Sequence, residues 1–131
     1  MTYVLVMIGS ALGGGLRYWL SGVASTHISD TFPIGTLIVN VSGSFVIGFF
    51  ATLTGPDGRV FVGSDGRQFF MTGICGGYTT FSSFSLQTLN LVRDGEMTYA
   101  AANIVLSVAL CLVAVWLGHI AALSLNQLKG A

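Results

Sequence analysis

The stretch from 73 to 85, GICGGYTTFSSFS, places three glycines and five serine or threonine hydroxyls inside a long apolar segment. Each glycine costs about 1 kcal/mol relative to alanine in a helix interior, so this composition predicts a break in a membrane-spanning helix. Irregular backbone at membrane depth is tolerated only where it is buried in protein or lines a water-filled cavity. Carbonyls freed by a break can bind a cation, and the N-terminus of a half-helix can face an anion. The stretch is therefore the candidate functional centre, with close helix packing through small residues as the alternative.

The composition is that of an integral membrane protein. Hydrophobic residues make up 53% of the 131 residues and charged residues only 8%, whereas soluble domains carry about 25% charged residues. Five basic and five acidic side chains cancel, which argues against a nucleic-acid surface. Cys75 and Cys111 both fall in apolar segments, and their positions indicate neither a disulfide framework nor a zinc site.

Four apolar segments, at about 3–25, 33–53, 68–92 and 97–125, predict an all-α membrane protein. Each is long enough for the roughly 20 residues that cross a bilayer, so the chain is expected to be a single four-helix transmembrane domain, 1–131. The third helix is expected to break near its middle. Few basic residues lie in the loops on either side, which leaves the positive-inside rule little to act on. Insertion in both orientations is therefore expected, and an antiparallel homodimer is the natural closed assembly.

Two features of the first segment indicate what this helix contacts. Gly9 and Gly13 form a GxxxG pair, which predicts close packing on another helix. Arg17 precedes Tyr18 and Trp19, and such aromatic side chains favour the membrane interface. Arg17 is therefore expected either to anchor the helix at that interface or to form an electropositive mouth that attracts anions.

Polar or small residues recur at four-residue steps on two segments, so each set lies along one helix face. On the second segment the set is Asn40, Ser44 and Gly48, and on the fourth it is Tyr99, Asn103, Ser107 and Cys111. An amide in hydrocarbon must find partners, so these faces must meet protein or line a pore. For Asn40 a structural hydrogen bond between helices is the alternative to a pore role. Phe81 and Phe84 share a helical face, and on spacing alone packing is the simplest interpretation.

The polar inventory of the spanning segments favours a small anion. No Asp or Glu lies within them, which argues against a proton-coupled exporter of the small multidrug resistance type, since such a carrier needs a carboxylate at membrane depth. The acidic rings of many cation channels are missing as well. Hydroxyl and amide donors, together with the electropositive edges of aromatic rings, suit an anion that moves without coupling.

At these residues a resemblance to a known family becomes close. The stretch GICGGYTTFSSFS resembles the third-helix signature of the Fluc (CrcB) fluoride channels. Two further stretches resemble the first- and second-helix motifs of that family: Gly14-x-x-Arg17-Tyr18 and Gly35-Thr36-Leu37-x-x-Asn40. With the length and the four crossings, the resemblance covers essentially the whole chain.

The resemblance implies a passive channel, not an enzyme, that exports fluoride through two antiparallel pores of a dual-topology homodimer. It places the protein in the bacterial inner membrane as a multi-pass protein that protects the cell from fluoride. The implied partners are fluoride, sodium, the lipid bilayer and a second copy of the chain, with no nucleic acid. The one implied cofactor is a structural Na⁺ at the dimer centre, bound by the backbone carbonyls of Gly76 and Thr79, with no organic cofactor.

The resemblance also assigns residues to the anion pathway. The phenylalanine pair of the family matches Phe81 and Phe84, and its pore asparagine matches Asn40. The polar track of the family matches hydroxyls of the third helix and the stripe of the fourth, namely Thr80, Ser82, Ser83, Tyr99, Asn103 and Ser107. Arg17 would supply vestibule electrostatics. A small dual-topology proton-coupled exporter remains the alternative.

Overall fold

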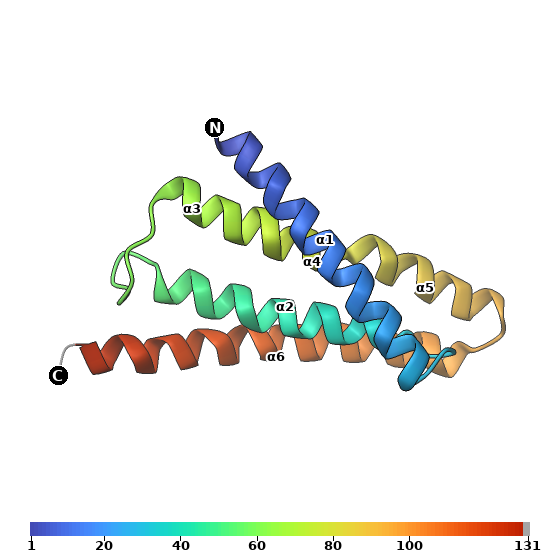
Figure 1. The fold of residues 1–131 in the computed structure, drawn as a ribbon. Helices are drawn as coiled ribbons and strands as arrows, with labels where there is room; N and C mark the ends of the chain where they lie inside the picture. Colours follow the sequence, from blue (N-terminus) through green and yellow to red (C-terminus); the bar gives the residue numbers. More distant parts are fainter. Residues whose placement is uncertain (130–131) are drawn as a thin grey trace.

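The computed structural model describes residues 1–129, and within them it contains helices and loops without any strand. The long elements are α1 (Thr2–His27), α2 (Ile34–Leu53) and α6 (Met97–Lys129). The third apolar segment folds as α3 (Ser64–Gln68), the π-helix η1 (Phe69–Cys75), α4 (Gly76–Tyr78) and, after a short gap, α5 (Phe81–Arg93). The predicted all-α fold is confirmed (Figure 1).

Three helices are long and apolar enough to cross a membrane without interruption. They are Thr2–His27, Ile34–Leu53 and Met97–Leu128, with mean hydropathies of 1.2, 1.8 and 2.4. The third segment is divided between two helical halves, so it does not form one uninterrupted spanning helix. Its first half begins at Ser64, earlier than the start expected near residue 68, and α6 continues past residue 125 to Lys129.

Helix α1 crosses the third segment at η1 and α4 (Figure 1). Glycines on both helices make this approach possible. A Cβ on Gly9 would lie 3.0 Å from the Cα of Gly73, and a Cβ on Gly13 would lie 2.8 Å from the backbone nitrogen of Tyr78. Gly77 faces Ser10 in the same way, with 2.8 Å from its added Cβ to the Cα of Ser10. The close contact predicted for the GxxxG pair is confirmed, and it is made with the glycine-rich stretch itself.

Helices α2 and α6 run side by side over most of their length (Figure 1). Each contributes one glycine to the contact. A Cβ on Gly48 would lie 2.9 Å from Cγ2 of Val115, and a Cβ on Gly118 would lie 2.9 Å from the backbone nitrogen of Phe49. In a membrane the hydrophobic effect does not drive helices together, so their association depends on close packing. Small residues allow the two backbones to approach closely enough for such packing.

Side chains from two helices hold the C-terminal end of α2. Arg67 donates to the carbonyl of Ala51 at 3.3 Å and to the hydroxyl of Thr54, while Asn126 Nδ2 donates to the carbonyl of Thr52 at 3.2 Å. Asn126 Oδ1 also accepts from the backbone N–H of Arg59 at 2.7 Å. Two of the carbonyls that the end of α2 leaves without helical partners, those of Ala51 and Thr52, are therefore satisfied by side chains of α3 and α6.

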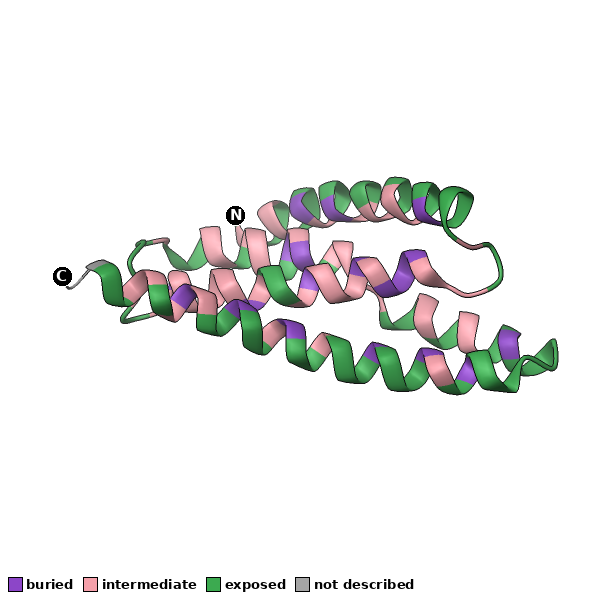
Figure 2. Cartoon of the chain, turned by 90° about the horizontal axis from the view of Figure 1, so that it is seen from below, coloured by how far each residue is buried: buried purple, intermediate pink, exposed green. Residues whose placement is uncertain are grey.

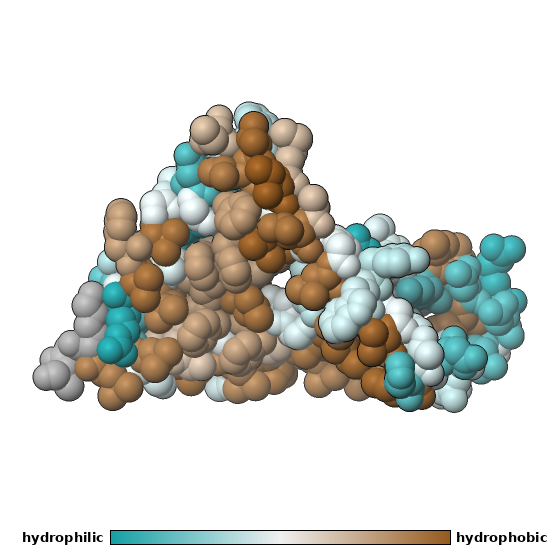
Figure 3. Space-filling model, viewed as in Figure 1, coloured by the Kyte–Doolittle hydropathy of each residue, from teal (hydrophilic) through white to brown (hydrophobic). Residues whose placement is uncertain are grey.

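The described part of the chain has a small buried core, and most of its residues are exposed or half-buried (Figure 2). Most of its buried apolar side chains are small: Ala24, Leu37, Val39, Cys75, Leu91, Ala100, Ala114 and Ala122. Large apolar side chains spread over the outside of the helices, and the hydrophilic surface gathers mainly near the ends (Figure 3). Such a surface belongs to an integral membrane protein, because lipid tails solvate it.

Candidate functional site

The third helix breaks at two residues in extended conformation. Thr79 has φ −84° and ψ 158°, and Thr80 has φ −153° and ψ 118°. The glycines just before them are helical, so the break falls at the end of the glycine-rich stretch and not within it. Both interpretations of this stretch therefore describe part of it, since the glycines pack against α1 and the threonines interrupt the helix.

Threonine side chains satisfy backbone groups on both sides of the break. The N–H and the hydroxyl of Thr79 both donate to the carbonyl of Cys75, at 2.9 and 3.0 Å. The hydroxyl oxygen of Thr80 accepts from the backbone N–H of Ser83 at 3.1 Å and lies 3.2 Å from the hydroxyl of Ser82. Thr80 is thus the N-cap of α5, a position at which threonine is favoured.

Asn40 of α2 binds the open backbone of the break from the side. Its Nδ2 donates to the carbonyl of Thr80 at 3.0 Å, and its Oδ1 accepts from the N–H of Thr80 at 2.8 Å. The amide therefore serves both backbone groups of one extended residue, as a neighbouring strand would. An asparagine amide has two N–H donors, and one of them is left over after this pairing.

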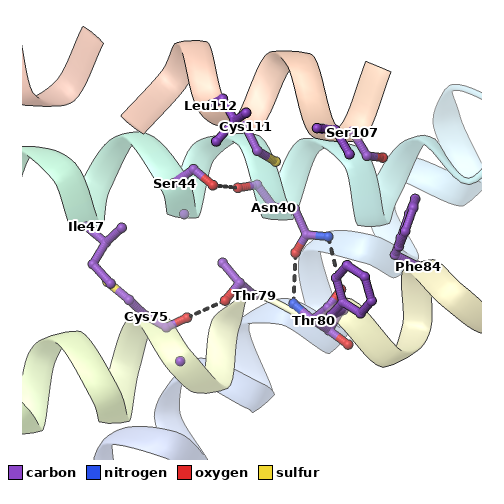
Figure 4. A pocket seen from close by; sticks show the side chains of 14 residues that line it. Asn40, Ser44, Ile47, Cys75, Thr79, Thr80, Phe84, Ser107, Cys111 and Leu112 are labelled. Atoms are coloured by element: carbon purple, nitrogen blue, oxygen red, sulfur yellow. Dashed lines mark hydrogen bonds between the residues drawn. The ribbon is translucent and has the colours of Figure 1, made fainter. Parts of the chain in front are cut away.

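A cavity of about 400 Å³ lies beside this pairing and is framed by α2, the broken helix and α6 (Figure 4). Its lining consists of Asn40, Gly43, Ser44, Ile47, Cys75, Gly76, Thr79, Thr80, Phe81, Phe84, Ser107, Val108, Cys111 and Leu112. None of these side chains carries a formal charge, and the polar groups among them are amide, hydroxyl and thiol. The cavity can therefore offer hydrogen-bond donors to a small ligand without a fixed counter-charge.

The two phenylalanines after the break meet at one edge of this cavity. The ring centroids of Phe81 and Phe84 are 5.3 Å apart and the ring planes are inclined by 54°. Phe81 is 78% exposed in the single chain, so its ring is not a core side chain of this protomer. Inclined aromatic pairs present ring edges, which carry partial positive charge.

The stripe predicted on the fourth helix divides into two parts. Ser107 and Cys111 line the cavity. Asn103 is 2% exposed and ties α6 to α5, because its Nδ2 donates to the hydroxyl of Thr88 at 2.9 Å. The Oδ1 of Asn103 accepts from the hydroxyl of Ser107 at 3.3 Å. Tyr99 makes an edge contact with the ring of Phe32, at a centroid distance of 5.8 Å. The structure therefore brings Asn40, Thr80, Phe81, Phe84 and Ser107 together and leaves Tyr99, Asn103, Ser82 and Ser83 outside the cavity wall.

The residues at the carbonyl end of the first half-helix have different surroundings. Gly76 and Thr79 line the cavity, and Gly76 is exposed in the single chain. The next carbonyl along, that of Gly77, accepts from Nε of Arg17 on α1 at 3.1 Å. Within residues 1–129 no cluster of three or more His, Cys, Asp or Glu side chains is placed to bind a metal. A cation at the break would therefore be bound by backbone carbonyls.

Four residues in or near the site have no assigned role in the sequence-based prediction, namely Ser42, Gly43, Tyr78 and Gln87. The Tyr78 and Ser42 hydroxyls hydrogen-bond at 2.9 Å, and an added Cβ on Gly43 would lie 3.1 Å from the Tyr78 ring. Oε1 of Gln87 is the one buried side-chain polar atom without a partner in the described part of the chain. An amide in an apolar helix, one turn after Phe84, is the signal that could have drawn attention to Gln87.

Comparison with known proteins identifies the family. Residues 4–119 match the family described as CrcB-like protein, Camphor Resistance (CrcB). The chain belongs to the CrcB family. CrcB relatives include the fluoride-specific ion channel FluC of Rhodospirillum rubrum, which is 64% identical over 97% of this chain and 98% of that protein. The proteins of the same name from Methylocella silvestris and Opitutus terrae are 60% and 63% identical, over 100% and 98% of this chain and 100% and 98% of their own lengths. These CrcB proteins are named as channels and not as enzymes.

The pairing of Asn40 with Thr80 predicts a measurable loss of stability in an isosteric variant. Asn40→Leu keeps the volume but leaves the N–H and C=O of Thr80 without partners, so we expect unfolding in detergent to become easier by about 2 kcal/mol. Ser44→Ala is the matched control, because the hydroxyl of Ser44 donates only to the Asn40 carbonyl of its own helix. Equal stability of the two variants in denaturant titrations would show that the pairing does not stabilise the break.

Proposed function

We propose that this protein is a passive fluoride-selective channel that exports cytoplasmic fluoride and so protects the cell from its toxicity. The observation that carries the proposal is the uncharged, mostly apolar cavity at the helix break, in which the Asn40 amide and the Thr80 hydroxyl lie next to the Phe81–Phe84 pair. The names of the CrcB relatives support fluoride as the permeant ion. The bacterial inner membrane is the proposed location, since these three CrcB relatives come from bacteria and cytoplasmic fluoride leaves the cell across that membrane.

Fluoride is small and strongly hydrated, so a selective path must replace its water shell with closely spaced donors. The remaining N–H of Asn40 and the Thr80 hydroxyl are the proposed donors, since both residues line the cavity together with Phe81 and Phe84. The Ser107 hydroxyl also lines the cavity, but it would have to release Asn103 Oδ1 before it could donate to an ion. Serines 82 and 83 and the Tyr99 and Asn103 side chains lie outside that wall in the single chain. These four residues would lie on the proposed pathway only if the pathway continues beyond the cavity toward the two ends of the molecule.

A proton-coupled exporter is the alternative, and the structure offers it no support. Coupling needs a group that exchanges a proton for substrate at membrane depth. No carboxylate or histidine lines the cavity, and the acidic residues all lie in loops or near helix ends.

Liposomes that contain the purified protein should release fluoride much faster than chloride. Release should need only a potassium ionophore for charge balance and no proton gradient, because no proton-binding group lies on the path. Ion-selective electrodes measure both fluxes, with protein-free liposomes as the control. Equal fluoride and chloride fluxes would contradict the proposal, and strict dependence on a proton gradient would favour the exporter.

The active assembly that we propose is an antiparallel homodimer with two pores. One chain leaves the cavity open at the broken helix, and Phe81 and Gly76 are exposed there, so a second copy would be needed to enclose the pathway. A cysteine at Phe61, which is 93% exposed in the loop before α3, should test this arrangement in a chain without Cys75 and Cys111. An impermeant thiol reagent should label about half of the molecules from each side, because the charge bias is small. Labelling from one side only would exclude the antiparallel dimer.

A structural Na⁺ bound by the Gly76 and Thr79 carbonyls of two chains is the proposed cofactor. The residues fit such an ion, since hard cations prefer oxygen ligands and the C-terminal end of a helix carries partial negative charge. Gly76 lines the cavity and is exposed in the single chain, so a second chain could contribute an equivalent pair of carbonyls there. Protein purified and reconstituted with N-methylglucamine in place of Na⁺ should lose fluoride flux and recover it when Na⁺ is added. Full flux throughout would remove Na⁺ from the proposal.

Phe84→Leu should separate a pore role from packing. The change nearly keeps apolar volume, so stability should fall by less than about 1.5 kcal/mol. Flux should fall by about tenfold or more, because the ring edge that faces the ion is lost. Phe50→Leu is the control, since Phe50 packs on Phe70 at a centroid distance of 4.2 Å and lies outside the cavity wall. Wild-type flux in well-folded Phe84→Leu and Phe81→Leu dimers would show that the two rings only pack.

A further inference from the structure

Arg17 makes one specific contact that neither an interfacial anchor nor an electropositive mouth explains. Its Nε donates to the carbonyl of Gly77, 60 residues away in the sequence, at 3.1 Å. This length is normal for an N–H···O bond. The neighbours Tyr18 and Trp19 are 85% and 63% exposed and face away from the bundle, whereas Arg17 is half-buried. The guanidinium thus turns toward protein at the depth of the helix break.

The packing of α1 explains how the side chain reaches this carbonyl. Gly9, Gly13 and Arg17 are spaced by four, so they lie on one face of α1. Gly9 and Gly13 bring that face against the backbone of η1 and α4, and Gly77 is held against Ser10. Arg17 follows one turn later, where the half-helix ends. The Arg17 side chain therefore meets the third segment at the end of its first half-helix.

The carbonyl that Arg17 binds is one that the break leaves without its helical partner. In an unbroken helix the Gly77 carbonyl would accept from the N–H of Phe81, but the chain between them is extended at Thr79 and Thr80. The Cys75 carbonyl is satisfied by Thr79 and the Thr80 carbonyl by Asn40. A cationic donor is also well matched to the partial negative charge at a helix C-terminus.

We propose that Arg17 is a positioning residue, whose hydrogen bond to Gly77 fixes the carbonyl end of the broken helix. It acts through the backbone on the adjacent Gly76 and Thr79 carbonyls and on the cavity wall that they form. This assignment deepens the proposed channel function, but its structural part stands independently of which ion permeates. Charge is secondary in this role, since what is required is a donor at the position of Nε.

Three substitutions separate the donor from the charge. Glutamine places its Nε2 at the same number of bonds from Cα as the Nε of arginine, and it has no charge. Methionine has similar reach and no donor. Lysine keeps the charge, but its ammonium nitrogen lies one bond farther from Cα than the Nε of arginine. Positioning predicts that Arg17→Gln keeps flux within about threefold of wild type and that Arg17→Met loses about tenfold or more, as expected for a lost hydrogen bond to a charged group. Arg93→Gln, at the exposed end of α5, is the control for removing one positive charge.

A direct readout of the Gly77 carbonyl does not depend on transport. Glycine precedes tyrosine only once in the sequence, at Gly77–Tyr78. Protein labelled with carbonyl-¹³C glycine and ¹⁵N tyrosine therefore gives a single carbon–nitrogen correlation in solid-state NMR, and it reports this carbonyl alone. We expect the Gly77 resonance to move to lower shift in Arg17→Met, where the hydrogen bond is lost, and to stay near the wild-type position in Arg17→Gln and Arg93→Gln.

The outcomes decide between positioning and long-range electrostatics. An unmoved Gly77 resonance in Arg17→Met overturns the assignment, and so does equal loss of flux in Arg17→Gln and Arg17→Met with flux retained in Arg17→Lys. A charge role further predicts that wild type and Arg17→Gln converge as salt screens the field, whereas positioning predicts a constant ratio. If Arg17→Met does not fold, the Gly77 resonance of Arg17→Gln decides alone. A clear move of that resonance from the wild-type position contradicts the assignment, and an unchanged position supports it. Absence of fluoride flux in the wild type would count against the proposed function and leave the NMR result standing.

Discussion

The structure depends on satisfying the backbone of a helix that breaks inside a membrane. An unpaired N–H or C=O costs several kcal/mol in the hydrocarbon region, and whole domains are stable by only about 5–15 kcal/mol. The break at Thr79 and Thr80 exposes several such groups at once. Asn40 binds both backbone groups of Thr80, Thr79 returns to Cys75, and Arg17 binds Gly77. Two of these residues lie on α1 and α2. The hydrogen bonds therefore stabilise the broken backbone and also fix the positions of α1 and α2 next to it.

Such contacts are short, and they require helices that approach more closely than leucine-lined helices do. The glycines of α1 and of the third segment supply that approach, because an added Cβ on Gly9 or Gly77 would overlap the facing backbone. The π-helix η1 adds to this, since its wider hydrogen-bonding ladder loosens the regular i→i−4 pattern just before the helix ends. The π-helix, the closely packed glycines and the extended threonines therefore follow one another along the chain, and the cavity lies where this segment ends.

The sequence predicts the elements and the location of the break well, and it predicts individual roles less well. Hydropathy and small-residue spacing predict four apolar segments, the contact face of Gly9 and Gly13, and a break within the stretch 73–85, which the structure places at Thr79 and Thr80, after the glycines. The partner of Asn40 could not be predicted, because an amide at membrane depth needs a partner without indicating whether it is protein or ion. Four-residue spacing likewise places Asn103 and Ser107 on one face, but it does not show that Asn103 faces α5 while Ser107 faces the cavity. The π-helix of Phe69–Cys75 has no recognisable sequence signal.

The charge arrangement at the break explains how a site without a charged lining can favour an anion. The end of one half-helix and the start of the next meet there, with partial charges of roughly −0.5 and +0.5 of an elementary charge. Left alone, these ends would largely cancel. The N–H that Arg17 donates to the Gly77 carbonyl offsets part of the negative end, as a neutral donor at that position would, and this leaves the N-terminus of α5, at Phe81, as the less compensated of the two. A cation at the Gly76 and Thr79 carbonyls would act in the same direction. The proposed pathway would then attract an anion through dipoles and ring edges, and it would still release it, because conduction requires binding that is favourable but weak.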